Sequence, residues 1–320
     1  MASKNILIFG STGLIGTRIT NAIVANKAHW DSVSIFTSKE TVASKSERIE
    51  ELKRQGVRVI TGDFTSESDV NEAYKGIDTV VSCVGRPVID KQLLLIQLAD
   101  KHPDVKRFLP SEYGTDIEYW ESSANEKPHQ LKLKVRALFK EVTNLDYTYV
   151  VTGPYGDADG GLYLGARKPE EEAVGCFDVK RKRAVVIGDG NGKISLSTMR
   201  DVGKFVVGAL LHPEESRNKA LHVNSFTTTE NELVTEFEKQ TGGQKWDVGY
   251  TSLAKLRELE EEAYKNGNPK AGGITLRRIW ASGGTLYDQR DNHLIGLEEG
   301  IDDLQSAVQL SISVQEGSSK

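Results

Sequence analysis

Cysteine is scarce in this chain. Only Cys83 and Cys176 occur among 320 residues, far apart and in no C-x-x-C arrangement. A chain of this length buries enough apolar surface to be stable without disulfides or a structural metal. We therefore interpret both cysteines as reduced thiols of a cytoplasmic protein, with Cys83 in a buried strand. The sequence also lacks the spacings typical of metal ligands, so no metal is expected.

An excess of positive charge and long apolar runs are lacking as well. The formal net charge is -5, so no basic surface is expected to attract nucleic acid or anionic lipid. Every apolar run is far shorter than the ~20 residues that a membrane helix requires. The opening MASKN leads directly into a strand pattern, without the features of a signal peptide. These observations predict a soluble protein with no nucleic-acid or membrane partner.

The first half of the chain alternates short apolar runs with amphipathic segments. The runs are bounded by turn residues, as buried parallel strands are, and the segments between them have helical periodicity. Strands are predicted at 5–10, 32–38, 57–63, 78–85, 106–114 and 146–153, and helices at 13–26, 46–56, 66–76, 91–102 and 128–142. This alternation favours an α/β fold of the Rossmann type, with a doubly wound parallel sheet.

Three glycines stand between the first predicted strand and the first helix. Gly10 permits a tight turn, Gly13 lets the backbone approach a pyrophosphate, and Gly16 lets the helix pack closely on the strand. Free N–H groups and the helix dipole at this point attract phosphates. The context favours a dinucleotide-binding turn over a purely structural one. The turn residues predicted to contact the cofactor are Gly10, Ser11, Thr12, Gly13, Leu14, Ile15 and Gly16.

The end of the second strand indicates which dinucleotide binds. An NAD site usually carries an acid there, whereas this chain has Thr37, Ser38 and Lys39. A hydroxyl and an ammonium suit a 2′-phosphate, so NADP(H) is the predicted cofactor. The alternative is that Lys39 is a solvated surface lysine. Asp63 either lies near the adenine or caps the helix that follows it. The predicted cofactor site also includes Phe64, Cys83, Val84 and Gly85.

The residue composition and periodicity of the sequence change after Gly153. The stretch 153–173 is rich in glycine and charge and has no clear period. Beyond it, a strand is predicted at 219–225, followed by a helix that Thr229 caps. We therefore predict an NADP(H)-binding domain over residues 1–153. Residues 154–320 are predicted to form a smaller substrate lobe that is interleaved with the sheet.

Two familiar catalytic motifs are missing. None of the ten tyrosines has a lysine four residues later, so the Tyr-x-x-x-Lys mechanism of many short-chain reductases is excluded in its usual form. The sequence also contains no G-x-S-x-G nucleophile element. Any reductase chemistry must therefore use another acid.

Four segments, FGSTGLIG, RFLPSEYGTD, LDYTYVVTG and GDGNGKISLSTMRDVGKFV, suggest which acid that is. Together they resemble the NmrA-like, isoflavone-reductase-like branch of the atypical short-chain dehydrogenases/reductases, over residues 4–235. The FLPSEYG element is specific, whereas the glycine triplet alone is not. The resemblance implies a Rossmann-type fold, bound NADP(H) and a catalytic lysine in a K-x-x-(I/V)-R pattern.

Lys132 and Arg136 match that pattern, so the resemblance assigns catalysis and a cofactor contact to Lys132. The match needs one inserted residue before YTYV, which leaves Lys134 as a rival. Helix periodicity does not distinguish Lys132 from Lys134, because the two lysines flank opposite sides of the apolar stripe. Either lysine could instead be a structural residue that snorkels beside a helix–sheet contact. An ammonium would stabilise the charge that hydride delivery builds on oxygen, and burial would lower its pKa. His129, three residues before Lys132 and on the side of this helix away from the apolar stripe, is predicted to be solvated.

Residues at two further strand exits complete the predicted site. Ser111 and Tyr113 follow the fifth strand at the edge where open α/β sheets bind ligands, and we expect them to contact cofactor or substrate. Glu112, between them, is predicted to be a structural anchor. The residues predicted to flank the nicotinamide after the sixth strand are Thr152, Gly153, Pro154 and Tyr155.

Three functions fit these residues. The first is an NADPH-dependent reductase of a small carbonyl or conjugated metabolite in natural-product biosynthesis, for which the resemblance favours a fungal setting. The second is an NADP(H)-dependent enzyme that couples a redox step to ring closure. The third is a non-catalytic dinucleotide sensor that acts through a partner, against which Lys132 argues. Substrate specificity is predicted to come from 157–173 and from the stretch around Trp246 and Tyr250. The sequence leaves the substrate and a homo-oligomeric state open.

Overall fold

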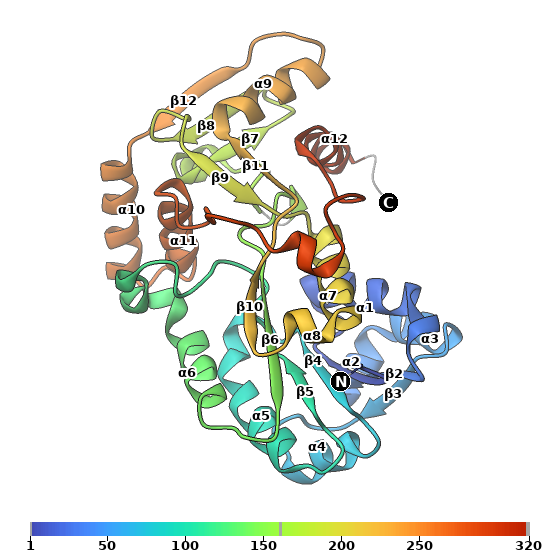
Figure 1. Ribbon diagram of the computed structural model, residues 1–320. Coiled ribbons are helices and arrows are strands. Elements are labelled where there is room, and N and C mark those ends of the chain that lie inside the picture. Colours follow the sequence, from blue (N-terminus) through green and yellow to red (C-terminus); the bar gives the residue numbers. More distant parts are fainter. Residues whose placement is uncertain (1, 160–161, 318–320) are drawn as a thin grey trace.

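The protein is built on a seven-stranded parallel sheet (Figure 1). The computed structural model describes residues 2–159 and 162–317. The strands of this sheet are β1 (Asn5–Phe9), β2 (Ser32–Thr37), β3 (Arg58–Thr61), β4 (Thr79–Ser82), β5 (Arg107–Leu109), β6 (Asp146–Val151) and β10 (Lys219–His222). Their order is β10-β6-β5-β4-β1-β2-β3. The order reverses at β1, as in the doubly wound Rossmann fold, which confirms the predicted fold class.

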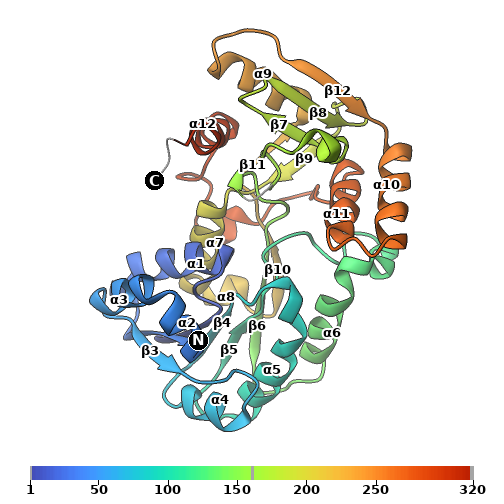
Figure 2. The ribbon, with the colours of Figure 1, turned by 180° about the vertical axis from the view of Figure 1, so that it is seen from behind.

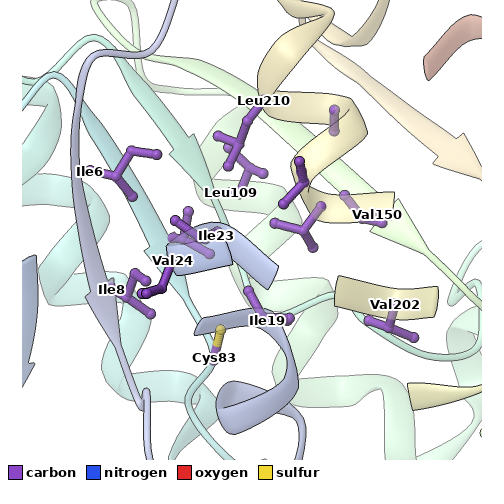
Figure 3. Packing of buried hydrophobic residues seen from close by; sticks show 14 of the residues in the cluster. Ile6, Ile8, Ile19, Ile23, Val24, Cys83, Leu109, Val150, Val202 and Leu210 are labelled. Carbon is purple, nitrogen blue, oxygen red and sulfur yellow. The ribbon is translucent and has the colours of Figure 1, made fainter. Parts of the chain in front are cut away.

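Helices cover both faces of the sheet because successive strand residues point to opposite faces. Ile6 and Ile8 of β1 belong to one core cluster, whereas Leu7 and Phe9 belong to another. The first face carries α1 (Leu14–Ala25), α3 (Ser46–Arg54) and α7 (Met199–Leu211), and the second carries α4 (Glu67–Tyr74), α5 (Gln92–Lys101) and α6 (Gln130–Phe139). Figure 3 shows the first cluster, with the helices packed over the strands.

Two segments from the second half of the chain belong to this part of the molecule. Helix α7 packs against α1 so closely that a Cβ on Gly203 would lie 2.8 Å from the carbonyl oxygen of Arg18. The short helix α8 (Pro213–Ser216) then leads to β10, which pairs in parallel with β6. The sheet is therefore completed by residues that follow Gly153 in the sequence.

The remaining elements form a lobe beyond one end of the sheet (Figures 1 and 2). It holds a three-stranded sheet in the order β12-β8-β7, a two-stranded antiparallel sheet of β9 and β11, and its own apolar cluster. The elements of the lobe are β7 (Cys176–Asp178), β8 (Arg183–Ile187), β9 (Lys193–Leu196), β11 (Phe226–Thr229), α9 (Glu230–Gln240), β12 (Asp247–Thr251), α10 (Leu253–Lys265), α11 (Ala271–Ala281) and α12 (Leu304–Gln315).

The strand predicted at 219–225 is wrong in extent. Strand β10 ends at His222, and β11 begins at Phe226 in a different sheet. The side-chain amide of Asn224 donates to the Phe226 carbonyl at 3.2 Å, which fits a chain that turns between the sheets. The predicted cap of the next helix is confirmed, because Thr229 forms a capping box with Glu232 at the start of α9. Within the described residues, no helix is long and apolar enough to cross a bilayer.

Candidate active site

A cavity of about 1040 Å³ lies at the carboxyl ends of the central strands. One side is formed by the turns that follow β1, β4, β5 and β6, and the other by the segment 162–174 with α10 and α11. Open α/β sheets bind ligands at this edge, where the strand order reverses. The sequence-predicted site residues that line the cavity are Gly13, Leu14, Ile15, Cys83, Val84, Gly85, Ser111, Tyr113, Lys132, Gly153, Pro154 and Tyr155.

The glycine turn has the close contacts that its spacing predicts. Gly10 has a φ of +73°, and a Cβ there would lie 2.5 Å from the carbonyl oxygen of Cys83. A Cβ on Gly16 would lie 2.0 Å from the carbonyl oxygen of Gly10. Gly13 is different, because its Cβ would meet only that same oxygen, at 3.3 Å, and the residue lines the cavity. Gly10 and Gly16 are thus required by the packing of the chain, whereas Gly13 leaves space for a ligand.

The turn leads into the N-terminus of α1, which suits a phosphate. Gly13 is the N-cap residue, and no side chain caps the helix. The first N–H groups of a helix have no intrahelical partner and carry the positive end of its dipole. The buried hydroxyl of Ser11 also has no hydrogen-bond partner among the described residues. These groups fit the pyrophosphate of a dinucleotide.

The predicted 2′-phosphate segment lies outside the cavity. Thr37 ends β2, and the Ser38 hydroxyl caps the helix α2 (Lys39–Ser44) by accepting from the Thr41 N–H at 3.2 Å. A second lysine, which was not predicted from the sequence, lies at the end of this helix. The ammonium of Lys45 donates to the carbonyl oxygen of Thr12 at 2.6 Å, which places a cation on the glycine turn. The sequence contains no signal for this contact, because the two residues are 33 positions apart.

Asp63 and Phe64 also lie outside the cavity lining. The carboxylate of Asp63 accepts from the N–H and the hydroxyl of Thr65, at 2.8 and 2.7 Å, and these bonds lower its pKa. The cap of α4 is Ser66, so the predicted capping role of Asp63 is wrong. Phe64 packs against the second core cluster. An adenine contact at these residues stays a prediction.

Lys132 lies in the wall of the cavity, near the start of α6. Its side chain is only 10% exposed, and the ammonium donates to the main-chain oxygen of Glu112 at 2.8 Å. Burial lowers the pKa of Lys132 to about 8, and the charges of Arg86 and Arg136 act in the same direction, against the opposing carboxylate of Glu112. Lys134, two residues later, is exposed. The structure thus distinguishes two lysines that helix periodicity left equivalent.

Arg136 connects α6 to the loop after β5. Its guanidinium forms two hydrogen bonds with the Glu112 carboxylate, at 3.1 and 3.4 Å, and the side chain of Glu112 is 1% exposed. A third nitrogen atom contacts Asp116 at 3.2 Å and Glu118 at 2.7 Å. Asp116 also accepts from His222 at 2.8 Å. Although burial raises the pKa of Asp116, the hydrogen bond from His222 and the charge of Arg136 lower it to about 2.

The other strand exits present neutral groups to the cavity. The Ser111 hydroxyl donates to the Val84 carbonyl at 2.9 Å, and the Tyr155 hydroxyl donates to the Tyr113 carbonyl at 2.6 Å. Burial raises the pKa of both tyrosines and of the Cys83 thiol. These groups are therefore uncharged near pH 7, unlike Lys132.

The exit from β6 turns away from the sheet at Gly153. This residue has a φ of +68°, and its Cβ would lie 3.0 Å from the Ser195 carbonyl oxygen. The N–H groups of Thr152 and Gly153 both donate to the carbonyl of Gly114. The loop after β5 and the loop after β6 are therefore joined by hydrogen bonds where they reach the cavity.

The predicted solvation of His129 is wrong. The side chain is buried, its Nδ1 lies 3.0 Å from the Ser123 carbonyl oxygen, and its ring meets Tyr119 edge-on. Burial lowers its pKa. Helix periodicity describes only the faces of the helix itself, whereas here the preceding loop folds back over the helix start.

The lobe side of the cavity is aromatic and cationic. The buried guanidinium of Arg277 lies 4.1 Å from the centre of the Tyr163 ring and donates to the Tyr163 carbonyl at 2.9 Å. Trp280 donates its ring N–H to the Thr115 hydroxyl at 2.7 Å. Arg277 and Trp280 were not predicted from the sequence, because they belong to α11, more than a hundred residues after Lys132.

The predicted specificity segments are only partly correct. Much of 157–173 lines the cavity, including Tyr163 and Arg167, whereas 160–161 lies outside the described residues. Trp246 and Tyr250 do not line it. Trp246 packs inside the lobe against Phe237, with ring centres 5.2 Å apart, and Tyr250 is 61% exposed on β12. The described residues contain no group of three or more potential metal ligands.

Comparisons with known proteins identify the family of this chain. Residues 2–259 match the model of the NmrA-like family. A phenylcoumaran benzylic ether reductase of Ginkgo biloba is 31% identical over 312 residues, which cover 93% of this chain and 94% of that protein.

Solved structures share the fold. The complex of leucoanthocyanidin reductase with NADPH from Vitis vinifera superimposes with a TM-score of 0.76 at 23% identity, over 96% of this chain and 99% of that one. The structure of AtPrR2 with NADP+ and (+)pinoresinol gives 0.80 at 22% identity, over 98% and 99%. With the family match covering most of its length, the chain belongs to the NmrA-like family.

Proposed function

We propose that this protein is an NADPH-dependent reductase of a small specialised metabolite, with Lys132 as its catalytic residue. The observation that carries the proposal is the position of the Lys132 ammonium. It is buried in the wall of the cavity, on the same sheet edge as the glycine turn, and its pKa is lowered to about 8. A group with a pKa near the working pH is suited to proton transfer.

The proposed cofactor is NADP(H), held by the glycine turn and the first turn of α1. Lys39 and Lys45 are the proposed partners of the 2′-phosphate. Lys39 is a cation just after β2, and Lys45 is a cation on the glycine turn. The bound cofactor would supply a hydride. The other residues proposed to contact it are Gly10, Ser11, Thr12, Gly13, Leu14, Ile15, Gly16, Thr37, Ser38, Asp63, Phe64, Cys83, Val84, Gly85, Ser111, Tyr113, Lys132, Gly153, Pro154 and Tyr155.

Lys132 would act on the oxygen atom of the substrate. Hydride addition to a carbonyl, or to a double bond conjugated with one, leaves negative charge on oxygen. The ammonium of Lys132 stabilises that charge and donates a proton to it. Tyr113 and Tyr155 are poorly suited to the role, because burial raises the pKa of each.

The proposed substrate is an aromatic metabolite. Tyr163 and Trp280 line the lobe side of the cavity, and the half-buried ring of Trp280 is proposed to contact an aromatic substrate. The relatives support this class by their names, which include a phenylcoumaran benzylic ether reductase and a structure with (+)pinoresinol. The reductase named here comes from Ginkgo biloba, and the fungal setting stays a prediction.

An NADPH oxidation assay on isoflavones, phenylcoumarans, pinoresinol and simple aromatic enones tests the proposal. We expect the Lys132→Ala variant to lower turnover by ~10²-fold or more, with little change in the Kd for NADPH, since the ammonium acts mainly in the transition state. Turnover in the wild type should fall above about pH 8, as the ammonium of Lys132 loses its proton.

Lys134→Ala is the matched control, because Lys134 is exposed on the same helix. It should retain normal turnover. A normal rate in the Lys132→Ala variant would refute the lysine mechanism. Tight NADPH binding with no consumed compound in the panel would instead favour a dinucleotide sensor, and a cyclised product would favour the ring-closing enzyme.

A further inference from the structure

The carboxylate of Glu112 lies between two cations of helix α6. Lys132 and Arg136 are one helical turn apart, so both side chains reach the loop after β5. Arg136 binds the carboxylate through two nitrogen atoms, at 3.1 and 3.4 Å. The ammonium of Lys132 is 3.7 Å from the same carboxylate and forms its short bond, 2.8 Å, with the main-chain oxygen of Glu112. The carboxylate therefore has its closest contacts with arginine.

This arrangement keeps the lysine from forming a full ion pair. A guanidinium binds a carboxylate through two parallel bonds, which an ammonium cannot match. Arg136 is itself held in place, because it also contacts Asp116 and Glu118 and lies over the ring of Tyr149. The position of the Glu112 carboxylate is thus set by the arginine and the loop.

We propose that Arg136 is a positioning residue that holds the Glu112 carboxylate on its own guanidinium, and so leaves the Lys132 ammonium hydrogen-bonded to a neutral carbonyl and free to exchange a proton at the cavity. This inference rests on the proposed function, in which Lys132 is the proton donor. It extends that function by identifying Arg136 and Glu112 as the residues that adjust the pKa of Lys132.

Three charged groups from the surrounding elements influence the pKa of Lys132. Glu112 raises the pKa of the lysine, whereas Arg86, after β4, and Arg136 lower it. Burial also lowers the pKa of His129, the N-cap residue of the helix, and the charge of Lys132 acts in the same direction. Arg136 and Glu112 therefore act on Lys132 in opposite directions, although they form one ion pair.

The opposite directions distinguish positioning from simple structural support. In the Arg136→Met variant, the carboxylate of Glu112 is released to the lysine and the opposing positive charge is lost, so the pKa of Lys132 should rise. In the Glu112→Gln variant, the negative charge is lost while an amide oxygen can still accept from Arg136, so the pKa should fall. We expect each change to be about one pH unit or more. A pair that only supported the fold, with no electrostatic effect on the lysine, would not move the pKa of Lys132 in opposite directions.

Titration by NMR of the full-length protein with ¹³C-labelled lysine measures this pKa without any substrate. The Cε signal of Lys132 is assigned by its loss in the Lys132→Met variant. Arg136→Lys keeps the charge and should stay closer to the wild type than Arg136→Met. Lys134→Gln, on the exposed face of the same helix, is the control and should leave the midpoint unchanged.

The two variants have distinct outcomes. Opposite shifts in Glu112→Gln and Arg136→Met support the inference, and where a substrate is known, the pH at which turnover falls should shift in the same directions. If Arg136→Met fails to fold, a lowered midpoint in Glu112→Gln still supports it. An unchanged or raised midpoint in Glu112→Gln overturns it. The titration requires no turnover, so it tests the positioning role independently of the proposed function. Normal activity in Lys132→Ala would refute the lysine mechanism, whatever the titration shows.

Discussion

The ammonium of Lys132 is held in a place that does not favour its charge. Its pKa is about 8 in the folded protein, against an ordinary value of 10.5, with burial as the main cause. A pKa that is lower in the folded state means that the unfolded chain binds the proton more tightly. Stability is therefore reduced below pH 8 and regained as the pH rises from 8 toward 10.5.

This sign makes a prediction for the Lys132→Met variant, which has no proton to lose. The free energy of unfolding of the wild type, relative to this variant, should increase by roughly 3 kcal/mol between pH 7 and pH 10.5. The carbonyl of Glu112 that the variant leaves unpaired adds a difference that does not depend on pH. Urea unfolding of both proteins across this range measures the change. A constant difference would show that the lysine is not perturbed, and Lys134→Met should give that constant difference.

The lysines near the glycine turn set the expected cofactor preference. We expect the wild type to bind NADPH more tightly than NADH, and Lys45→Ala and Lys39→Ala each to weaken NADPH binding by about tenfold or more, because a charge-assisted contact contributes ~1.5–3 kcal/mol. Calorimetric titration with both cofactors measures this. NADH affinity should be unaffected in Lys39→Ala and should fall less than NADPH affinity in Lys45→Ala, because Lys45 also contacts the glycine turn. Lys53→Ala, an exposed lysine paired with Glu50, is the control. Equal affinities of the wild type for the two cofactors would contradict the assignment of NADP(H).

At the scale of elements, the turn between β1 and α1 combines packing and binding. Gly16 has no room for a side chain, because its Cβ would lie 2.0 Å from a carbonyl oxygen, whereas Gly13 has ordinary helix N-cap geometry, with φ −76°. Gly16 is therefore required for the packing of the chain, whereas Gly13 is required to leave space for a ligand.

Valine at each position separates these requirements. Gly13→Val should abolish NADPH binding with little change in the free energy of unfolding, because its side chain would occupy the space next to the helix start. Gly16→Val should lower the free energy of unfolding by about 3 kcal/mol, through overpacking. Urea unfolding and NADPH titration of both variants test this. Normal NADPH binding by Gly13→Val would place the phosphate site elsewhere.

At the scale of the whole molecule, the two halves of the chain share one core. Val202, Phe205 and Leu210 of α7 lie in the same buried cluster as Ile19 and Ile23 of α1. Figure 3 shows Val202 and Leu210 together with the two isoleucines. The boundary that the sequence suggests at residue 153 therefore crosses a continuous core. A chain cut there would expose apolar residues on α1 and leave β6 as an edge strand.

We expect a fragment of residues 1–153 to lack cooperative unfolding and NADPH binding. It has the complete glycine turn, but loses α7 and β10, which cover α1 and pair with β6. Circular dichroism during urea titration compares the fragment with the full chain. A sigmoidal transition and NADPH binding in the fragment would show that residues 1–153 form an independent domain.

Local patterns in the sequence determine much of this protein. The alternation of strands and helices predicts the parallel sheet, because a buried strand and an amphipathic helix each have their own period. The glycine turn is equally local, since its three residues contact one another and the start of one helix. Thr229 caps α9 through Glu232, only three residues away. The family pattern, not the helix period, singled out Lys132.

Only the tertiary structure decided which side chains meet at the cavity. The oxygen that accepts from Lys132 belongs to Glu112, twenty positions earlier. Trp280 contacts Thr115 across 165 positions, and Lys45 reaches Thr12 across 33. His129 is buried by a loop that folds over it, which its own helix could not indicate. Periodicity describes the direction of a side chain relative to its own element, and it holds no information about which distant segment packs against that face.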